Sequence, residues 1–279
     1  MKRFHVLAVA LAALLCVLPL ASCAENGKVN LDKGYEAADM TMSATDKDGN
    51  VIGTFTFEEG LGDTAILVKY EGKAIRDDEV NVPSMFGERT IIGVASEAFY
   101  HLAALKKVIL PDTVTYIDDN AFTGCVHLET VVLPKALTRI GAGAFLDCAA
   151  LTTLENLSEA PITAIDERAF WGCTALDLQL PATLESIGDA AFWGCTALKQ
   201  VIVPDSLKTI GRLAFYECTG IENIRLNNNL EEIGEYAFVL DGSTLKDKID
   251  VTGVTNEKVL EYVENIKEPT EPETEAPEA

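Results

Sequence analysis

An alanine–phenylalanine pair recurs through most of this chain of 279 residues. Successive phenylalanines are 22 to 25 residues apart, a period at which repeat proteins stack one small structural unit per repeat. The pairs recur within the pattern I-G-x-x-A-F-x-x-C-x-x-L, which is complete from Ile187 to Leu198 and partly kept in other units, and a second signature, L-x-x-V-x-L-P, runs between the pairs. The pairs are Ala98-Phe99, Ala121-Phe122, Ala144-Phe145, Ala169-Phe170, Ala191-Phe192, Ala214-Phe215 and Ala237-Phe238. This regularity fixes the architecture and leaves the ligand open.

The segment LETVVLP (128–134) shows how one unit folds. Val131 points inward while Thr130 and Val132 point outward, the alternation of a short strand. Pro134 ends the pairing because it has no N–H to donate, and Gly141 offers a tight corner before the Ala-Phe pair enters the core. One coil cannot bury its own apolar side, so stacked coils bury it against each other and the two ends need caps.

Period and motif together are typical of a leucine-rich-repeat solenoid. We predict a β-rich α/β fold of short strands and short helical turns, with an N-terminal β-meander cap and a short C-terminal helix. The expected segments are a lipoprotein signal peptide at 1–22, a tether at 23–39, the meander cap at 40–79, the solenoid at 80–250, the cap helix at 251–266 and a disordered acidic Pro/Glu tail at 267–279.

Within the solenoid, Val80 to Leu105 is an irregular first repeat, and Leu157 to Pro161 lies in a longer unit that predicts a bulge or a small loop. Regular strand positions are expected to begin at Lys107, Thr130, Thr153, Asp177 and Gln200. After the array, an apolar stripe on one helical face, with Asn256 as a cap, predicts a helix to Ile266 over the last coil.

The segment DKDGN in the meander allows two interpretations. Asp46, Asp48 and Asn50 have the spacing of calcium-loop ligands, but an EF-hand counted from Asp46 needs glycine where Val51 stands and glutamate where Phe57 stands. A hairpin turn at Asp48-Gly49 is therefore favoured.

The first residues predict export. Lys2 and Arg3 precede the uncharged apolar run Val6 to Leu20, which is too short for a comfortable membrane span. The sequence Leu-Ala-Ser-Cys ending at Cys23 resembles the lipobox of bacterial lipoproteins, in which the cysteine carries lipid. The alternative is an ordinary secretory signal cut nearby, with Cys23 incidental. Acyl chains on Cys23 would hold the protein at a membrane.

The formal charge is −22 and becomes −24 without the signal peptide. There is no basic stripe to neutralise phosphates, which excludes a nucleic-acid partner. Adsorption to anionic lipid is also disfavoured, so the lipid anchor is the only membrane link that we expect.

Five cysteines occupy one repeat position: Cys125, Cys148, Cys173, Cys195 and Cys218. They are expected to stack as a buried column about 4.8 Å apart. Metal ligands must converge on a point, so no metal site is expected. Neighbouring sulfurs could bond at that separation, but we favour buried thiols that pack as small hydrophobes.

No catalytic motif occurs, and no cofactor is implied. There is no G-x-S-x-G, H-E-x-x-H or glycine-rich phosphate loop. His101 and His127 are the histidines outside the signal peptide, and because they occupy nearly equivalent repeat positions, each is interpreted as a surface residue near the same turn. The carboxylates are spread along the coils, so a nonenzymatic role is predicted.

From about Val80 to Phe238 the units resemble the BspA-like leucine-rich repeats of bacterial surface proteins, and the preceding meander resembles their entry segment. The resemblance implies a secreted or surface-anchored interaction protein, in a family associated with adhesion to host matrix or other cells. This array is shorter, and the lipobox stands in place of a cell-wall sorting motif or secretion domain. Because the motif positions form the core, they do not identify the ligand.

Ligand contacts must come from outward positions. On the strands, the candidates are Ile109, Val132, Gln179, Ile202 and Arg225. The residue after each Ala-Phe pair forms a second row, in which Trp171, Trp193 and Tyr216 are expected to form an aromatic strip; the alternative is half-buried packing beside the turn.

The sequence thus predicts an extracytoplasmic, lipid-anchored protein at the bacterial cell surface that binds a protein partner and acts in adhesion. The partner would be a host-matrix, neighbouring-cell or envelope protein. A structural or assembly subunit of the cell envelope is one alternative, and a carbohydrate-binding lipoprotein is another.

Overall fold

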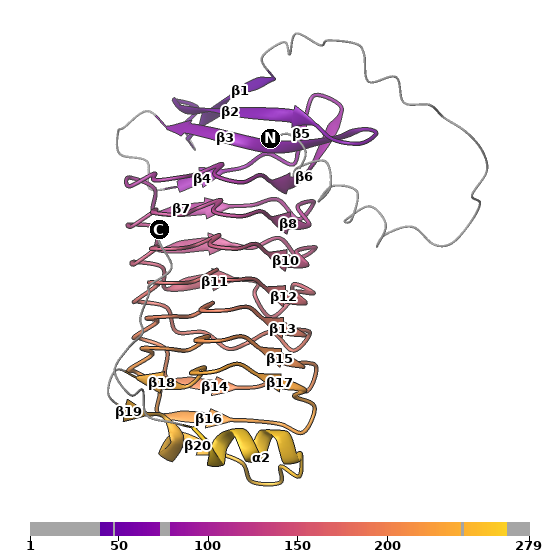
Figure 1. Ribbon diagram of the computed structural model, residues 1–279. Coiled ribbons are helices and arrows are strands. Elements are labelled where there is room, and N and C mark those ends of the chain that lie inside the picture. Colours follow the sequence, from indigo (N-terminus) through magenta and orange to yellow (C-terminus); the bar gives the residue numbers. More distant parts are fainter. Residues whose placement is uncertain (1–39, 47, 73–78, 241–242, 267–279) are drawn as a thin grey trace, which may run out of the picture.

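The computed structural model describes residues 40–46, 48–72, 79–240 and 243–266 of the chain. They form a straight stack of coils with a β-meander at one end and helix α2 (Glu257–Glu264) at the other (Figure 1). The predicted leucine-rich-repeat solenoid with its two caps is confirmed. Cys23, the signal peptide, the tether and the acidic tail lie outside the described residues.

Strands β1 (Thr41–Thr45), β2 (Val51–Glu59) and β3 (Thr64–Gly72) form the antiparallel meander. The β1–β2 turn is the predicted hairpin turn, with Gly49 at φ +83°. Here the Asp46 carboxylate accepts hydrogen bonds from Asp48 N, Asn50 N and Asn50 Nδ2 at 2.8 to 2.9 Å. The bonds from Asn50 lower the pKa of Asp46. The carboxylate therefore holds its own turn.

The meander joins the solenoid through main-chain pairing and aromatic packing. Strand β3 runs parallel to β6 (Arg89–Val94), which also pairs with the short strand β5 (Met85–Phe86). The buried ring of Tyr70 lies 5.6 Å from that of Phe99. The cap thus covers the first coil as a repeat array requires.

One long sheet begins in the meander and continues along the solenoid, with β6 followed by one two-residue parallel strand per coil. These strands are β8 (Tyr116–Ile117), β10 (Arg139–Ile140), β12 (Ala164–Ile165), β13 (Ser186–Ile187), β15 (Thr209–Ile210) and β17 (Glu232–Ile233).

A second parallel face consists of strands in two groups, each strand of three residues except β20, which has two. The first group is β4 (Glu79–Asn81), β7 (Lys107–Ile109), β9 (Thr130–Val132) and β11 (Thr153–Glu155). The second group is β14 (Gln200–Ile202), β16 (Asn223–Arg225) and β20 (Ile249–Asp250). The predicted alternation holds: Val131 is fully buried between the half-buried Thr130 and Val132.

The two groups are separated by residues 177–180, which form no strand. The strand predicted to begin at Asp177 is therefore wrong. Leu176 to Pro181 is one residue shorter than the equivalent Leu198 to Pro204. Side chains alternate between the two faces of a strand. With one residue missing, this segment cannot keep both its hydrogen-bond register and its inward-facing side chains aligned with the neighbouring strands. We call residues 177–180 the sheet break.

The preceding coil has the opposite irregularity. Its predicted small loop is confirmed as a turn at 156–159, with Asn156 at φ +65°. The Asn156 side chain donates to Leu133 O of the coil before it at 3.1 Å, so the longer loop stays fastened to the stack.

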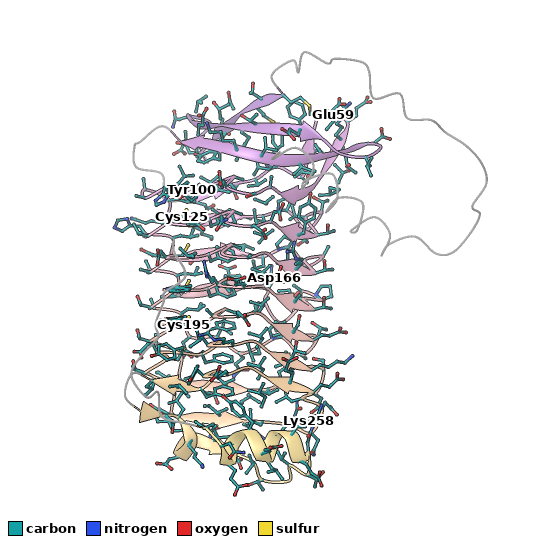
Figure 2. The ribbon with its side chains drawn as sticks, in the orientation of Figure 1. Glu59, Tyr100, Cys125, Asp166, Cys195 and Lys258 are labelled. Atoms are coloured by element: carbon teal, nitrogen blue, oxygen red, sulfur yellow. The ribbon has the colours of Figure 1, made fainter. Side chains whose placement is uncertain are left out.

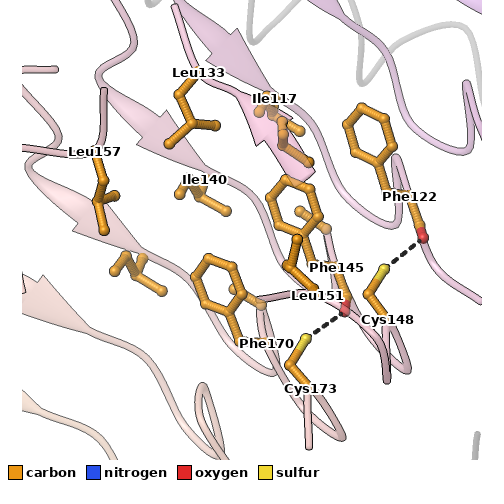
Figure 3. Close-up of a cluster of buried hydrophobic side chains, with 14 of the residues drawn as sticks. Ile117, Phe122, Leu133, Ile140, Phe145, Cys148, Leu151, Leu157, Phe170 and Cys173 are labelled. Carbon is orange, nitrogen blue, oxygen red and sulfur yellow. Dashed lines mark hydrogen bonds between the residues drawn. The ribbon is translucent and has the colours of Figure 1, made fainter. Parts of the chain in front are cut away.

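Phenylalanine rings form the centre of the solenoid (Figure 3). All seven Ala-Phe phenylalanines are fully buried, and successive rings lie 4.7 to 5.3 Å apart at 1° to 13°. Tyr70 extends the column into the meander, and Tyr262 of α2 meets Phe238 edge-on at 6.4 Å. Each additional coil adds one more ring–ring contact of the same kind. The stability of the array therefore grows as a sum of contacts between neighbouring coils.

The predicted short helical turns are single turns closed by i→i+3 hydrogen bonds, such as Cys125 N to Phe122 O at 3.1 Å. A residue with positive φ precedes each Ala-Phe pair, and another follows it two positions after the phenylalanine in the six coils from Phe99 to Phe215. Asn120 (φ +56°) and Gly124 (φ +72°) are one such set. These left-handed residues break helical continuity and keep the turn compact.

The glycine of the I-G step has a different role from the predicted corner. Gly141, Gly188, Gly211 and Gly234 have no positive φ. Instead, a Cβ on Gly188 would lie 2.4 Å from Glu167 N in the preceding coil, and the others would lie 2.3 to 2.8 Å from backbone atoms. Glycine is present here because adjacent backbones approach closely.

The C-terminal cap begins with the hairpin of β18 (Val239–Leu240) and β19 (Ser243–Thr244), followed by the 3-10 turn η1 (Lys246–Lys248). Helix α2 then packs over the last coil with Val259 buried, as predicted. Asn256 caps it by accepting from Lys258 N at 3.0 Å and also donates to Leu230 O at 2.7 Å.

The two glycine roles can be separated in one coil. Gly188→Ala should destabilise the protein by about 1 to 3 kcal/mol, because the new methyl group meets fixed backbone. Gly194→Asn should cost under about 1 kcal/mol, because asparagine tolerates positive φ and a Cβ at Gly194 would meet nothing within 4 Å. Thermal or urea unfolding measures both. A Gly188→Ala protein as stable as the wild type would contradict the close-approach explanation.

Candidate functional site

The face formed by the three-residue strands, here called the strand face, carries most of the predicted ligand-binding residues. They lie in two columns, because the parallel strands are in register. Ile109, Val132 and Glu155 are aligned in the first group of strands, and Ile202 and Arg225 in the second. Ile202 is 46% exposed, while Ile109 and Val132 are half-buried. The structure thus brings Ile109 and Val132 together, and the sheet break separates them from Ile202.

The charges on this face are mixed. Lys107 pairs with Glu79 at 3.4 Å between adjacent strands. Arg225 is aligned with Asp250, whose pKa is lowered mainly by hydrogen bonding from Thr252 and to a lesser degree by Arg225. Charged side chains therefore lie beside the aliphatic ones on this face.

The sheet break contains Gln179, which is exposed, between the half-buried Leu178 and Leu180. Leu154 of β11 is also half-buried, whereas the matching Val131 of β9 is fully buried. The core is therefore less well covered here than elsewhere on the strand face.

The predicted aromatic strip exists. The rings of Trp171 and Trp193 are stacked at 4.5 Å and 5°, and Tyr216 follows at 4.6 Å and 56°. The Ala-Phe turns lie along one side of the stack, which Figure 2 marks by Tyr100, Cys125 and Cys195. Both tryptophans are half-buried, and Tyr216 is only 6% exposed.

Stacking covers the ring faces of the strip. Trp193 lies between Trp171 and Tyr216, and the guanidinium carbon of Arg168 lies 5.4 Å from the Trp171 ring centroid. A sugar ring packs on an open aromatic face, whereas this arrangement offers mainly ring edges. The geometry favours a protein contact over carbohydrate capture and leaves half-buried packing as the competing role.

The five repeat cysteines are free and buried, and each thiol donates to the phenylalanine carbonyl of the preceding coil at 3.0 to 3.2 Å. Two such bonds, Cys148 to Phe122 and Cys173 to Phe145, are visible in Figure 3. Burial raises the pKa of Cys125 and Cys218 to about 12. The buried-thiol interpretation is confirmed, and these thiols are poor nucleophiles.

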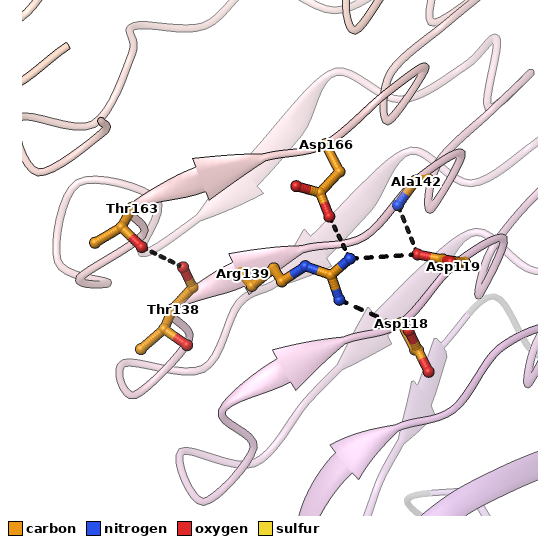
Figure 4. A network of polar contacts seen from close by, with 7 residues as sticks. All are labelled: Asp118, Asp119, Thr138, Arg139, Ala142, Thr163 and Asp166. Carbon is orange, nitrogen blue, oxygen red and sulfur yellow. Dashed lines mark hydrogen bonds and ion pairs between the residues drawn. The ribbon is translucent and has the colours of Figure 1, made fainter. Parts of the chain in front are cut away.

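Arg139 forms a charge cluster that the repeat motif does not predict (Figure 4). Its guanidinium pairs with Asp166 of the next coil and lies 3.6 Å and 3.8 Å from Asp119 and Asp118 of the preceding one. Burial raises the pKa of Asp166, and Arg139 opposes that shift. Asp118 and Asp166 occupy the repeat position at which other coils have glycine. A charged residue in place of this glycine was the sequence signal for the cluster. The cation links three coils and neutralises acids that would otherwise repel.

A polar hollow of about 740 Å³ lies near the C-terminal cap, lined by residues such as Asp205, Lys208 and Lys258. Its asparagines hold the cap: Asn228 Oδ1 accepts from Thr255 N at 2.6 Å and from Asn256 N at 3.1 Å. The described residues contain no group of three or more His, Cys, Asp or Glu side chains that could hold a metal ion.

His101 and His127 are both exposed, but they are not at equivalent positions. His101 has φ +56° and matches Gly124 of the next coil, whereas His127 lies further along its own coil, with Nδ1 at 2.7 Å from Ala103 O. In the part of the chain that the structure describes, no helix is long and apolar enough to cross a membrane.

Comparison with known proteins supports the fold directly. A model of the BspA-type leucine-rich repeat region matches residues 92–178 and 163–250. The crystal structure of a leucine-rich repeat protein from T. pallidum has a TM-score of 0.58 and 30% identity, covering 66% of this chain and 85% of that one. A leucine-rich cell surface protein from Faecalibacterium prausnitzii A2-165 has a TM-score of 0.59 and 30% identity, covering 71% of this chain and 52% of that one. No curated protein matches.

The double change Trp171→Ala with Trp193→Ala tests the strip. If the strip binds a partner, affinity should fall by at least about tenfold with a small change in melting temperature. Binding is measured on an array of matrix, envelope and glycan ligands, and stability by thermal unfolding. Tyr100→Ala, at the same repeat position but 48% exposed and outside the strip, is the control. A large melting loss, or full binding by a folded double variant, would assign the tryptophans to packing.

Proposed function

We propose that this chain, which belongs to the BspA-type leucine-rich-repeat family, is a protein-binding module of the bacterial cell surface. Its binding surface is the strand face formed by β7, β9 and β11 and continued by β14 and β16. Its proposed role is adhesion to a protein of the host matrix or of a neighbouring cell. A relative at 30% identity is described as a cell surface protein, which supports the location.

The observation that carries the proposal is the pairing of Ile109 with Val132 on adjacent strands of a rigid sheet. The hydrogen bonds between the strands hold the backbones of both residues. This surface is therefore already ordered before a partner binds, and it loses little conformational entropy on binding. Polar neighbours such as Lys107 and Thr130 provide the rim.

The anchor is the second part of the proposal. A lipid on Cys23 would hold the chain at the outer side of the cytoplasmic membrane or at the cell surface, and a tether of 23–39 would reach at most about 60 Å when fully extended. The meander is then the end nearest the membrane, and α2 is the far end of the solenoid (Figure 1). The strand face runs between the two ends and stays accessible.

A nonenzymatic role fits the same observations. Repeat families of this kind are typically not enzymes, and the buried thiols of this solenoid have raised pKa values. Recognition through surface side chains needs no cofactor. An envelope assembly subunit would use the same surface on a different partner, so the partner's origin separates the two roles.

The strand face is tested by Ile109→Asp with Val132→Asp. Binding to the partner, found by pull-down from matrix proteins and from envelope extract, should weaken by at least about tenfold, because two charges replace the apolar centre. The matched control is Ser186→Asp with Thr209→Asp, a pair that is also half-buried and aligned on adjacent strands of the other sheet. Equal binding by the two variants would refute a strand-face site.

The anchor is tested by Cys23→Ser. The variant should leave the membrane fraction for the medium or accumulate as an uncleaved precursor, because the residue that carries the lipid is gone. Membrane fractionation and the size of the protein measure both. A variant that is processed and membrane-held like the wild type would rule out lipidation at Cys23.

A further inference from the structure

The two stacked tryptophans of the aromatic strip border an open space. Trp171 and Trp193 are each followed by a glycine with positive φ, Gly172 at +73° and Gly194 at +72°. Apart from its own chain neighbours, a Cβ on Gly194 would meet no atom within 4 Å. No other described residue therefore fills the space at Gly194, next to Trp193. We call this space the Gly194 notch.

Acidic residues lie on both sides of the Gly194 notch along the stack. A Cβ on Gly172 would lie 2.5 Å from Asp147 Oδ1, so the Asp147 carboxylate covers that glycine. In the next coil, Glu217 holds the repeat position of Gly194, whose N–H donates to Tyr216 O at 2.8 Å. A group that enters the notch therefore has an acidic residue on either side.

The residues before the Ala-Phe pairs add further negative charge to this side of the stack. The residue two positions before each pair forms a row, whose exposed members beside the strip are Glu167, Asp189, Arg212 and Glu235. Arg168 pairs with Glu167 at 3.3 Å and lies 5.4 Å from the Trp171 ring centroid. The charge of Arg168 is therefore already matched. Whereas the charges on the strand face are mixed, acids outnumber cations around the strip.

The strip presents apolar ring edges on a backbone that is already ordered. Asp147 N donates to Trp171 O at 2.7 Å, and Gly172 N donates to Trp193 O at 2.8 Å, so each tryptophan is held by the coil before it. Both rings are half-buried. A partner therefore binds without ordering this surface. Apolar side chains with a charged rim are the usual arrangement of a protein interface.

We infer that the turns carrying the strip form a second interaction surface, which binds a protein segment with an apolar centre and lysine or arginine beside it. The apolar residues of that segment pack on the ring edges of Trp171 and Trp193. A basic side chain of the segment enters the Gly194 notch, and an acidic segment is excluded by like charge. The inference goes beyond the strand-face proposal and does not depend on it, because the surface consists of turn residues.

The site can be observed directly, because Trp171 and Trp193 are the only tryptophans of the chain. Their fluorescence is followed while a tryptophan-free peptide is added, with a leucine-phenylalanine-leucine centre and lysines on both sides. Matched peptides carry glutamine or glutamate in place of lysine. At low salt, the lysine peptide should change the emission saturably and bind at least about tenfold more tightly than the glutamine peptide. The glutamate peptide should give no saturable change.

Two outcomes of this titration would overturn the inference. One is the absence of a saturable change with the lysine peptide. The other is equal affinity of the lysine and glutamine peptides, which would show that the acidic residues around the strip do not select the partner.

Gly194→Asn fills the notch and tests its role. Asparagine tolerates positive φ, so the variant should fold, and it should bind the lysine peptide at least about tenfold more weakly. Asp147→Asn, at φ +58°, removes a carboxylate beside the notch and should also weaken binding. Thermal unfolding checks that both variants are folded.

The matched control is Gly62→Asn in the meander. Gly62 has φ +65°, and a Cβ there would also meet nothing within 4 Å, so this variant should bind the lysine peptide like the wild type. Equal binding by Gly194→Asn and Gly62→Asn proteins would contradict a role of the notch. Because the fluorescence reports on the strip alone, that result would leave the strand-face proposal to be judged by the Ile109 and Val132 variant.

Discussion

One buried phenylalanine per repeat stacks on that of the next coil, and this ring column sets the spacing of the whole solenoid. The rings are nearly parallel and about one strand spacing apart, so main-chain pairing and ring packing require the same rise per coil. That shared rise brings the thiols within reach of the preceding carbonyls and leaves no room for a Cβ at Gly188. The meander and α2 complete the column with Tyr70 and Tyr262, which keeps the last rings out of water.

The same arrangement directs function to the surface. The repeated motif residues are buried, so they stabilise the solenoid and cannot select a ligand. Burial also makes the cysteines unreactive, and the single cation of Arg139 holds three aspartates in a structural role. What remains for recognition is the non-motif set on the strand face and beside the Ala-Phe turns. These positions differ from coil to coil, as a specific binding surface requires.

The departures from regularity gather in adjacent coils. The coil with the extra residues at 156–161 is followed by the coil that lacks one at 177–180, and the tryptophan stack belongs to Trp171 and Trp193 of the same region. A repeat array is stable when every coil is alike, so an irregular coil costs pairing energy that its neighbours must offset. Such local inconsistency is a common mark of a functional position.

The solenoid, its two caps, the inward and outward strand positions and the cysteine column could be predicted from the residues alone, because each follows from the repeat period. It also placed Trp171, Trp193 and Tyr216 in one row. Four features emerged only from the folded chain: the burial of that row, the close backbone approach at Gly141, the link that Arg139 makes between three coils, and the absence of the strand expected at Asp177. Those outcomes depend on distances between residues more than twenty positions apart, and a motif records which residue types recur but not how neighbouring backbones meet.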